Sequence, residues 1–289
     1  MATISSRIQK QHQRIAQACH AAGRDVHSVT LLVVSKTFPA EDVREAFEAG
    51  ERRFGENYVQ EGLDKIAALA DLRDQLEWHL IGPLQSNKTK PVAEHFDWVH
   101  SVDRLKIAQR LSEQRPAHLP PLNICLQVNI SGEASKSGAN PAEVPALARA
   151  VAGLPRLRLR GLMAVPEPAA QFEAQRQPHR ALAALLAQVR TELQAEQAAQ
   201  QDLTLDTLSM GMSADLEAAV AEGASMVRIG SAIFGSRAAK PAAEASTAPD
   251  ATSCEVPIGC IGCSPGLVLR DWKSPNPQSA QEDNPDEHS

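Results

Sequence analysis

The chain has 289 residues and 43% of them are hydrophobic, so it is long enough to bury a large core in one or two domains. It contains no 18-residue apolar run, which excludes a membrane-spanning helix, and residues 1–10 are too polar for a signal peptide. Residues 241–289 hold eight acidic and two basic residues, which leaves 27 of each sign in residues 1–240. This neutral body offers no basic surface for nucleic acid.

An amphipathic helix is predicted over residues 4–22, where Ile8, Ile15 and Cys19 lie near helical spacing and Gly23 ends the pattern. A short apolar stretch, a polar junction and a helical stretch then recur. The predicted strands cover residues 31–35, 53–55, 78–81, 98–102, 123–130, 157–165, 205–209 and 226–229. The predicted helices between them cover residues 40–50, 59–72, 103–111 (with Asp103 as N-cap), 142–152, 171–200 and 214–222.

Eight strands that alternate with helices favour a single (β/α)8 barrel, a TIM barrel, over residues 1–238. A doubly wound open sheet is the alternative, but evenly spaced units close naturally. Residues 239–289 form an acidic, proline-rich tail with seven prolines after position 240, and we predict that they are disordered.

The five cysteines are scattered, as is typical of a protein in the reducing cytoplasm, where we expect this chain to act as a monomer. Cys254, Cys260 and Cys263 come close together in the tail. A structural zinc site needs four ligands with paired spacing, and no nearby histidine supplies the fourth. We therefore predict no metal site.

The first candidate site residue is Lys36. Leu31 to Val34 are four consecutive apolar residues, typical of a strand buried on both faces, and Lys36 follows on the same face as Val34. The amine is therefore directed from the carboxyl end of a strand, where barrel enzymes place their chemistry. The alternative is a lysine whose ammonium simply reaches solvent.

The junctions after the last two strands favour an anion. Met212 and Ser213 follow the seventh strand, and Gly230 and Ser231 follow the eighth, an arrangement that recurs in phosphate-binding barrels. Ser213 could instead be a plain N-cap. Arg228 lies on an apolar strand, which is costly unless it faces a site or pairs with a carboxylate such as Glu56. An amine together with a phosphate pocket fits an aldehyde that carries a phosphate, pyridoxal 5′-phosphate (PLP).

The sequence resembles the pyridoxal phosphate homeostasis protein family, which is related to the barrel domain of alanine racemase. The resemblance spans about residues 1–238 and rests on segments 34–37, 54–61, 78–88, 127–130, 135–138, 161–163, 208–215 and 227–235. It implies that Lys36 forms the Schiff base with PLP, that Asn57 lies near the ring and that Arg228 faces the pyridine nitrogen. It also implies that Ser213, Gly230 and Ser231 surround the phosphate. Phe38 departs from the family, which often has lysine there.

The resemblance also raises the question of catalysis. Racemases of this fold take a second base, a tyrosine, from an additional domain, whereas the only tyrosine here is Tyr58, which we expect to pack at the barrel mouth. A permanently charged Arg228 weakens the ring as an electron sink. We therefore predict a PLP carrier or buffer without substantial turnover, with apo-enzymes as recipients. A PLP-dependent racemase and a phosphate-binding barrel without a covalent lysine are the alternatives.

Four other residues receive structural interpretations or weaker functional ones. His79 and His100 are predicted to be hydrogen-bonded core residues, and Cys125 a small buried hydrophobic residue. Lys136 lies in a polar loop after the fifth strand, where the resemblance favours a functional surface.

Overall fold

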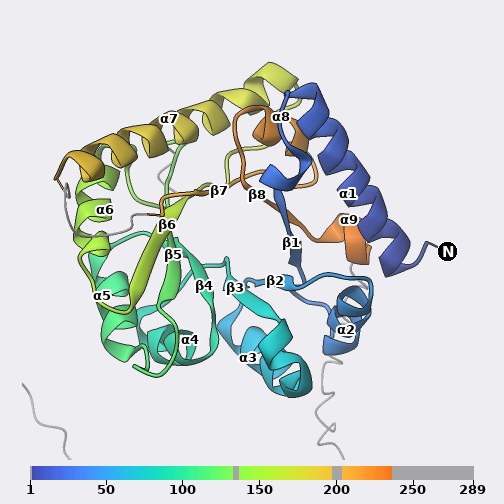
Figure 1. Ribbon diagram of the computed structural model, residues 1–289, viewed down its shortest axis with the longest axis horizontal. Coiled ribbons are helices and arrows are strands. Elements are labelled where there is room, and N and C mark those ends of the chain that lie inside the picture. The colour runs from blue at the N-terminus through green and yellow to red at the C-terminus, as the bar shows by residue number, and fades with distance from the viewer. Residues whose placement is uncertain (1, 133–136, 197–203, 236–289) are drawn as a thin grey trace, which may run out of the picture. The chain divides into compact units, whose positions relative to one another are not determined.

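The computed structural model describes residues 2–132, 137–196 and 204–235, and within them eight parallel strands close into a barrel in the order β1 to β8 (Figure 1). The strands are β1 (Thr30–Val34), β2 (Arg53–Glu56), β3 (Glu77–Leu80), β4 (Trp98–Val102), β5 (Leu122–Gln127), β6 (Leu157–Met163), β7 (Thr207–Ser209) and β8 (Met226–Ile229). The barrel prediction is confirmed. The open sheet is wrong, because β1 pairs directly with β8 and places Leu32 beside Arg228.

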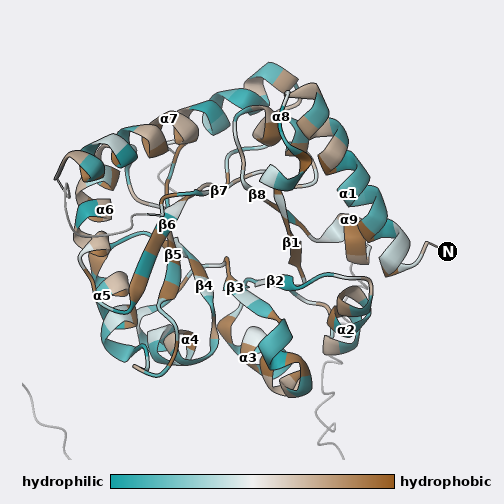
Figure 2. Cartoon of the chain, viewed as in Figure 1, coloured by the Kyte–Doolittle hydropathy of each residue, from teal (hydrophilic) through white to brown (hydrophobic). Residues whose placement is uncertain are grey.

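The helices form a ring outside the strands (Figure 1). They are α1 (Ile4–Ala21), α2 (Ala40–Glu48), α3 (Val59–Ala68), α4 (Thr89–His95), α5 (Leu105–Gln114), α6 (Val144–Ala152), α7 (Phe172–Glu196), α8 (Leu216–Ala221) and α9 (Ser231–Phe234). Figure 2 shows teal and brown segments on these helices, as amphipathic helices require, and β1 largely in brown. In the part of the chain that is described, no helix is long and apolar enough to cross a membrane.

Alternate residues of β1 face opposite sides of the barrel wall. Leu31 and Val33 join the hydrophobic core between strands and helices, whereas Val34 lines a cavity at the barrel mouth. This alternation places Lys36 on the inward face, as the sequence pattern predicts. Cys125 is fully buried beside Trp98 and Met163, which confirms its structural interpretation, and burial raises the pKa of its thiol to about 12.

Several predicted boundaries differ from the structure. Helix α5 begins at Leu105 with Arg104 as N-cap, so the N-cap prediction for Asp103 is wrong; its carboxylate accepts a hydrogen bond from Arg104 instead. Strand β5 ends at Gln127 rather than at residue 130, because the chain turns there and Gly132 donates to the Asn129 carbonyl. Helices α4 and α9 were not predicted. The predicted tail, with Cys254, Cys260 and Cys263, and also Lys136, lies outside the described residues.

Candidate functional site

A cavity of about 390 Å³ opens at the carboxyl ends of β1, β2, β7 and β8. All seven candidate binding residues line it: Lys36, Asn57, Met212, Ser213, Arg228, Gly230 and Ser231. Val34, Ile81, Val165 and Ala214 complete the lining, so part of the wall is apolar. The barrel closure thus brings an amine from the first strand together with loops almost two hundred positions later.

The β1–β2 side of this cavity is held by a buried cluster of charged groups. Ser35 Oγ donates to Glu56 Oε1 at 2.6 Å, and these two residues come directly before Lys36 and Asn57. Lys65 Nζ donates to the Ser35 carbonyl at 2.7 Å and to Glu56 Oε1 at 2.8 Å. These bonds fasten the end of β1 to the end of β2, and so fix where the Lys36 backbone leaves the strand.

The electrostatics of this cluster exclude one sequence-based alternative. Glu56 is fully buried, and burial raises the pKa of its carboxyl even though the hydrogen bonds from Lys65 and Ser35 oppose the shift. Its ionic partner is Lys65, so the alternative that Glu56 pairs with Arg228 is wrong. Lys65 also pairs with Glu61, whose carboxylate accepts a hydrogen bond from the Thr37 N–H.

The turn after Lys36 is tight. Thr37 has a φ of 67°, in the left-handed region that residues other than glycine rarely adopt. Two residues after Lys36, the Phe38 ring stacks on Phe234 of α9 with ring centroids 4.8 Å apart. This contact ties the Lys36 loop to the helix that follows β8, so the position often held by lysine in the family has a packing role here.

Gly82 positions Asn57 by close backbone approach. A Cβ at residue 82 would lie 2.1 Å from the Asn57 carbonyl oxygen, so only glycine fits there. Gly82 lies in the segment 78–88 that carries the family resemblance, but the sequence alone indicates no role for it. A glycine directly after a strand could have indicated a close backbone contact. Only the fold shows that the contact is with the Asn57 carbonyl.

On the β7–β8 side, the loop that carries Met212 and Ser213 is held from outside the cavity. The Met212 N–H donates to Asp215 Oδ1 at 2.7 Å, and His179 Nε2 lies 3.0 Å from Asp215 Oδ2. Burial opposes ionisation of Asp215, but the bonds from His179 and the Met212 N–H prevail and lower its pKa. Asp215 is the N-cap of α8, so the N-cap alternative for Ser213 is wrong.

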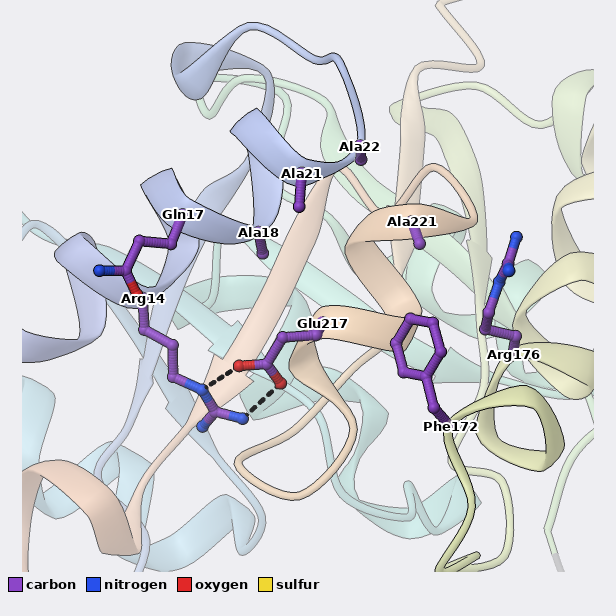
Figure 3. Close-up of a pocket in the computed structure, with 9 residues that line it drawn as sticks. All are labelled: Arg14, Gln17, Ala18, Ala21, Ala22, Phe172, Arg176, Glu217 and Ala221. Atoms are coloured by element: carbon purple, nitrogen blue, oxygen red, sulfur yellow. Dashed lines mark hydrogen bonds and ion pairs between the residues drawn. The ribbon is translucent and has the colours of Figure 1, made fainter.

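Arg14 supports the same loop from α1. Its Nη1 donates to the Ser213 carbonyl at 2.7 Å, and its Nε and Nη2 donate to the Glu217 carboxylate. Figure 3 shows this pair in a second cavity, of about 630 Å³, lined by residues of α1, α7 and α8. None of the seven candidate residues lines this second cavity. Nothing in the sequence pattern of α1 indicated that Arg14 supports the candidate site.

Gly230 lets the end of β8 close against the end of β1. A Cβ there would lie 2.8 Å from the Val34 carbonyl oxygen. The residues that follow form the short helix α9. The N–H groups of Ile233 and Phe234 donate to the Gly230 carbonyl, which leaves those of Ser231 and Ala232 at the amino-terminal end of the helix. Ser231 is exposed at this position, so its hydroxyl and these N–H groups are available to an anion in the cavity.

Arg228 is a buried cation beside the cavity, with a relative exposure of 5%. It donates to the carbonyl and hydroxyl of Ser209 and to the Ala164 carbonyl, all of them neutral acceptors. Across residues 2–132, 137–196 and 204–235, no carboxylate forms an ion pair with it. Burial lowers the pKa of Arg228 to about 10, so the guanidinium remains protonated at neutral pH and can receive an electron-rich ligand group.

Three other residues that the sequence singles out do not line the cavity. Tyr58 is 59% exposed and does not line the cavity, so the expectation that it packs at the barrel mouth is wrong for most of its surface. His79 and His100 are fully buried and bonded to each other, with 2.9 Å between His79 Nδ1 and His100 Nε2. Their interpretation as hydrogen-bonded core residues is therefore confirmed.

Comparison with known proteins agrees with this geometry. The profile of the family described as alanine racemase, N-terminal domain, matches residues 7–238. A pyridoxal phosphate homeostasis protein from Pseudomonas aeruginosa is 63% identical over 237 residues, which cover 82% of this chain and 97% of that protein. The protein of the same name from Escherichia coli K12 is 53% identical over 238 residues, which cover 82% and 98%. The chain belongs to the pyridoxal phosphate homeostasis protein family.

Solved structures extend the comparison. PipY from Synechococcus elongatus, determined with PLP bound, is 40% identical; the match covers 76% of this chain and all of that one, with a TM-score of 0.61. Alanine racemase from Corynebacterium glutamicum is only 16% identical, with a TM-score of 0.56, and that match covers 61% of the racemase chain. The racemase therefore shares the fold, and the family members carry the argument about the site.

Proposed function

We propose that this protein binds PLP through a Schiff base at Lys36 and acts as a carrier or buffer of the cofactor inside the cell. The observation that carries the proposal is that one cavity is lined by Lys36, by the buried cation of Arg228 and by the two loops that follow β7 and β8. Membership of a family whose members are named for pyridoxal phosphate homeostasis supports it.

The residues present fit PLP in three respects. The cavity holds an amine, and an amine forms an imine with an aldehyde. Arg228 has neutral partners only, so it has room for an electron pair such as that of a pyridine nitrogen. The close approach at Gly230 leaves backbone N–H groups of α9 for a phosphate. Bound PLP supplies an aldehyde and a conjugated ring, and these residues hold it.

The chain's own groups have distinct tasks in binding. Lys36 would supply the amine that condenses with the aldehyde of PLP, with loss of water. Asn57, held in place by Gly82, would contact the ring, while Ser213, Gly230 and Ser231 would hold the phosphate and Met212 would complete that wall. The charge on Arg228 keeps the ring nitrogen unprotonated, which weakens the ring as an electron sink and disfavours amino-acid chemistry.

The racemase alternative needs a second proton-transfer group on the other face of the substrate. Tyr58, the only tyrosine in the chain, is largely exposed and does not line the cavity. We therefore propose that the protein has no substantial turnover, and that it delivers PLP to apo-enzymes.

An absorption spectrum tests the covalent attachment. The full-length protein with PLP should show a visible band, and borohydride reduction followed by peptide mapping should find the modification on Lys36. Lys36→Ala should lose the band, whereas the control Lys90→Ala, which removes an exposed lysine of α4, should keep it. A wild-type protein that stays colourless would favour a phosphate-binding barrel without a covalent lysine. Exchange of the α-hydrogen of alanine would favour the racemase.

A further inference from the structure

A chain of hydrogen bonds crosses the inside of the barrel from its amino-terminal end to the cavity. It begins at Glu77, the first residue of β3, whose Oε1 lies 2.9 Å from His79 Nε2. His79 Nδ1 lies 2.9 Å from His100 Nε2 in β4, and His100 Nδ1 lies 2.9 Å from Ser209 Oγ in β7. Arg228 of β8 donates to the same Ser209 Oγ at 2.9 Å.

The interior residues of this series of hydrogen bonds have no contact with solvent. His79, His100 and Ser209 are all 0% exposed, and the Trp98 ring packs against both imidazoles, at 5.2 and 5.6 Å between ring centroids. Burial lowers the pKa of His79 and lowers that of His100 well below its ordinary value, so both rings are neutral at neutral pH. Only Glu77 reaches water, with 37% of its side chain exposed.

The direction of every bond in the chain follows from its two ends. Burial opposes ionisation of Glu77, but its bond to His79 and the Arg53 guanidinium, whose Nε lies 3.2 Å from Glu77 Oε1, prevail and lower its pKa to about 2. Glu77 is therefore a carboxylate and only accepts. A neutral His79 must therefore donate from Nε2 and accept at Nδ1. His100 must then donate from Nε2, and its Nδ1 accepts the proton of the Ser209 hydroxyl. The lone pairs of Ser209 Oγ are left for Arg228, which only donates.

We propose that Glu77, His79 and His100 are positioning residues that form a polarised relay, which holds Ser209 as the acceptor for Arg228 and so sets the orientation and charge that Arg228 presents to its ligand. The identity of that ligand, the ring nitrogen of PLP, rests on the proposed function. The relay supplies Arg228 with part of the negative charge of a distant carboxylate, because successive hydrogen bonds polarise one another in a low-dielectric interior. A carboxylate placed directly on Arg228 would instead neutralise it.

Nuclear magnetic resonance tests the relay without any cofactor. In the full-length protein labelled with ¹⁵N-histidine, His79 and His100 should both be neutral and carry their proton on Nε2. A coupling across the hydrogen bond should connect His100 Nε2 with His79 Nδ1. A charged ring, or a proton on Nδ1 of either histidine, would overturn the proposal.

A second measurement asks whether the relay acts on the ligand. Glu77→Gln keeps the shape and an acceptor for His79 but removes the charge, far from the cavity. It should weaken PLP binding between about twofold and tenfold, within the range of one neutral hydrogen bond, and shift the visible band. The control Glu51→Gln likewise removes a carboxylate from a histidine, His12, outside the relay, and should change neither.

Substitutions at His100 separate the relay from simple packing. His100→Asn keeps an acceptor for the Ser209 hydroxyl and should retain more PLP affinity than His100→Phe, for which we expect a loss of at least about tenfold. If Glu77→Gln matches Glu51→Gln in affinity and spectrum, the relay is structural only. If the wild type binds no PLP while the histidine tautomers are as described, the proposed function fails and the hydrogen-bond directions stand.

Discussion

The two sides of the cavity are held in opposite ways. On the β1–β2 side, Lys36 and Asn57 follow Ser35 and Glu56, which are joined by a buried ionic cluster around Lys65. On the β7–β8 side, Arg228 is buried against neutral acceptors and has no ion pair among the described residues. On the first side, the buried charges of Glu56 and Lys65 are paired with each other. The second keeps a cation available.

The difference indicates that one side of the cavity fixes the backbone and that the other side attracts the ligand. A paired charge such as Lys65 fixes the backbone but has little attraction left for a ligand. An unpaired buried cation is costly in the empty protein, and an electron-rich ligand group offsets that cost when it binds. We therefore expect the side that presents the Lys36 amine to fix geometry, and the side that presents the Arg228 guanidinium to supply affinity.

The largest expected effect comes from breaking the ionic cluster. Lys65→Met leaves the Glu56 carboxylate buried without its partner, so the free energy of unfolding should fall by about 3–5 kcal/mol at neutral pH. Urea unfolding measures it. The double variant Lys65→Met/Glu56→Gln should recover most of the loss, since an amide needs no counter-charge. A control that removes the exposed pair of Arg44 and Asp71, Arg44→Met, should lose less than about 1 kcal/mol.

The pH dependence of that effect has a definite sign. The pKa of Glu56 is raised in the folded protein, so the native state holds this proton more tightly than the unfolded chain does. Stability from this group is therefore lost as the pH rises from the ordinary glutamate pKa through the folded one. The defect of Lys65→Met should shrink on going from neutral pH to about pH 5, toward the ordinary glutamate pKa. A pH-independent loss would mean that water reaches Glu56.

Much of this architecture could be predicted from the sequence. The strands 98–102 and 226–229 have the predicted ends, and all seven candidate residues line one cavity, because alternating apolar stretches and strand-end junctions are local signals. The supports of the site were missed for a physical reason. Lys65 reaches the Ser35 carbonyl across 30 positions of the chain, and His179 reaches Asp215 across 36, so no local pattern encodes these contacts. The same holds for the link from His100 to Ser209.

A smaller loss of stability is expected from a substitution at Gly82, which crowds the backbone without changing any charge. Gly82→Ala places a Cβ 2.1 Å from the Asn57 carbonyl oxygen, so the turn must move and the protein should lose about 1–3 kcal/mol. PLP affinity should fall as Asn57 is displaced. The matched control is Gly153→Ala, whose Cβ would meet its nearest atoms at 3.8 and 4.0 Å. With a φ of −80°, that variant should be unchanged or up to about 1 kcal/mol more stable.

The smallest effect on stability is expected at Asp215, on the anion-binding side. Asp215→Asn weakens the bonds to the Met212 N–H and to His179, and should lower the free energy of unfolding by about 1 kcal/mol. If this loop binds the phosphate as proposed, the ratio of the affinities for PLP and for pyridoxal should fall several-fold. The control Asp206→Asn, which weakens a pair with Arg160 away from the cavity, should leave that ratio unchanged.

The pH dependence at Asp215 runs opposite to that at Glu56. The pKa of Asp215 is lowered in the folded protein, so its contribution is present above the ordinary aspartate pKa and is lost as the pH falls through the folded one. Acid should therefore loosen the β7–β8 side of the cavity while it relieves the Glu56 cluster on the β1–β2 side. The affinities for PLP and for pyridoxal can be measured by titration at decreasing pH. Their ratio should fall while the β1–β2 side of the fold, which carries Lys36, remains intact. Equal responses on both sides would contradict the division of tasks between them.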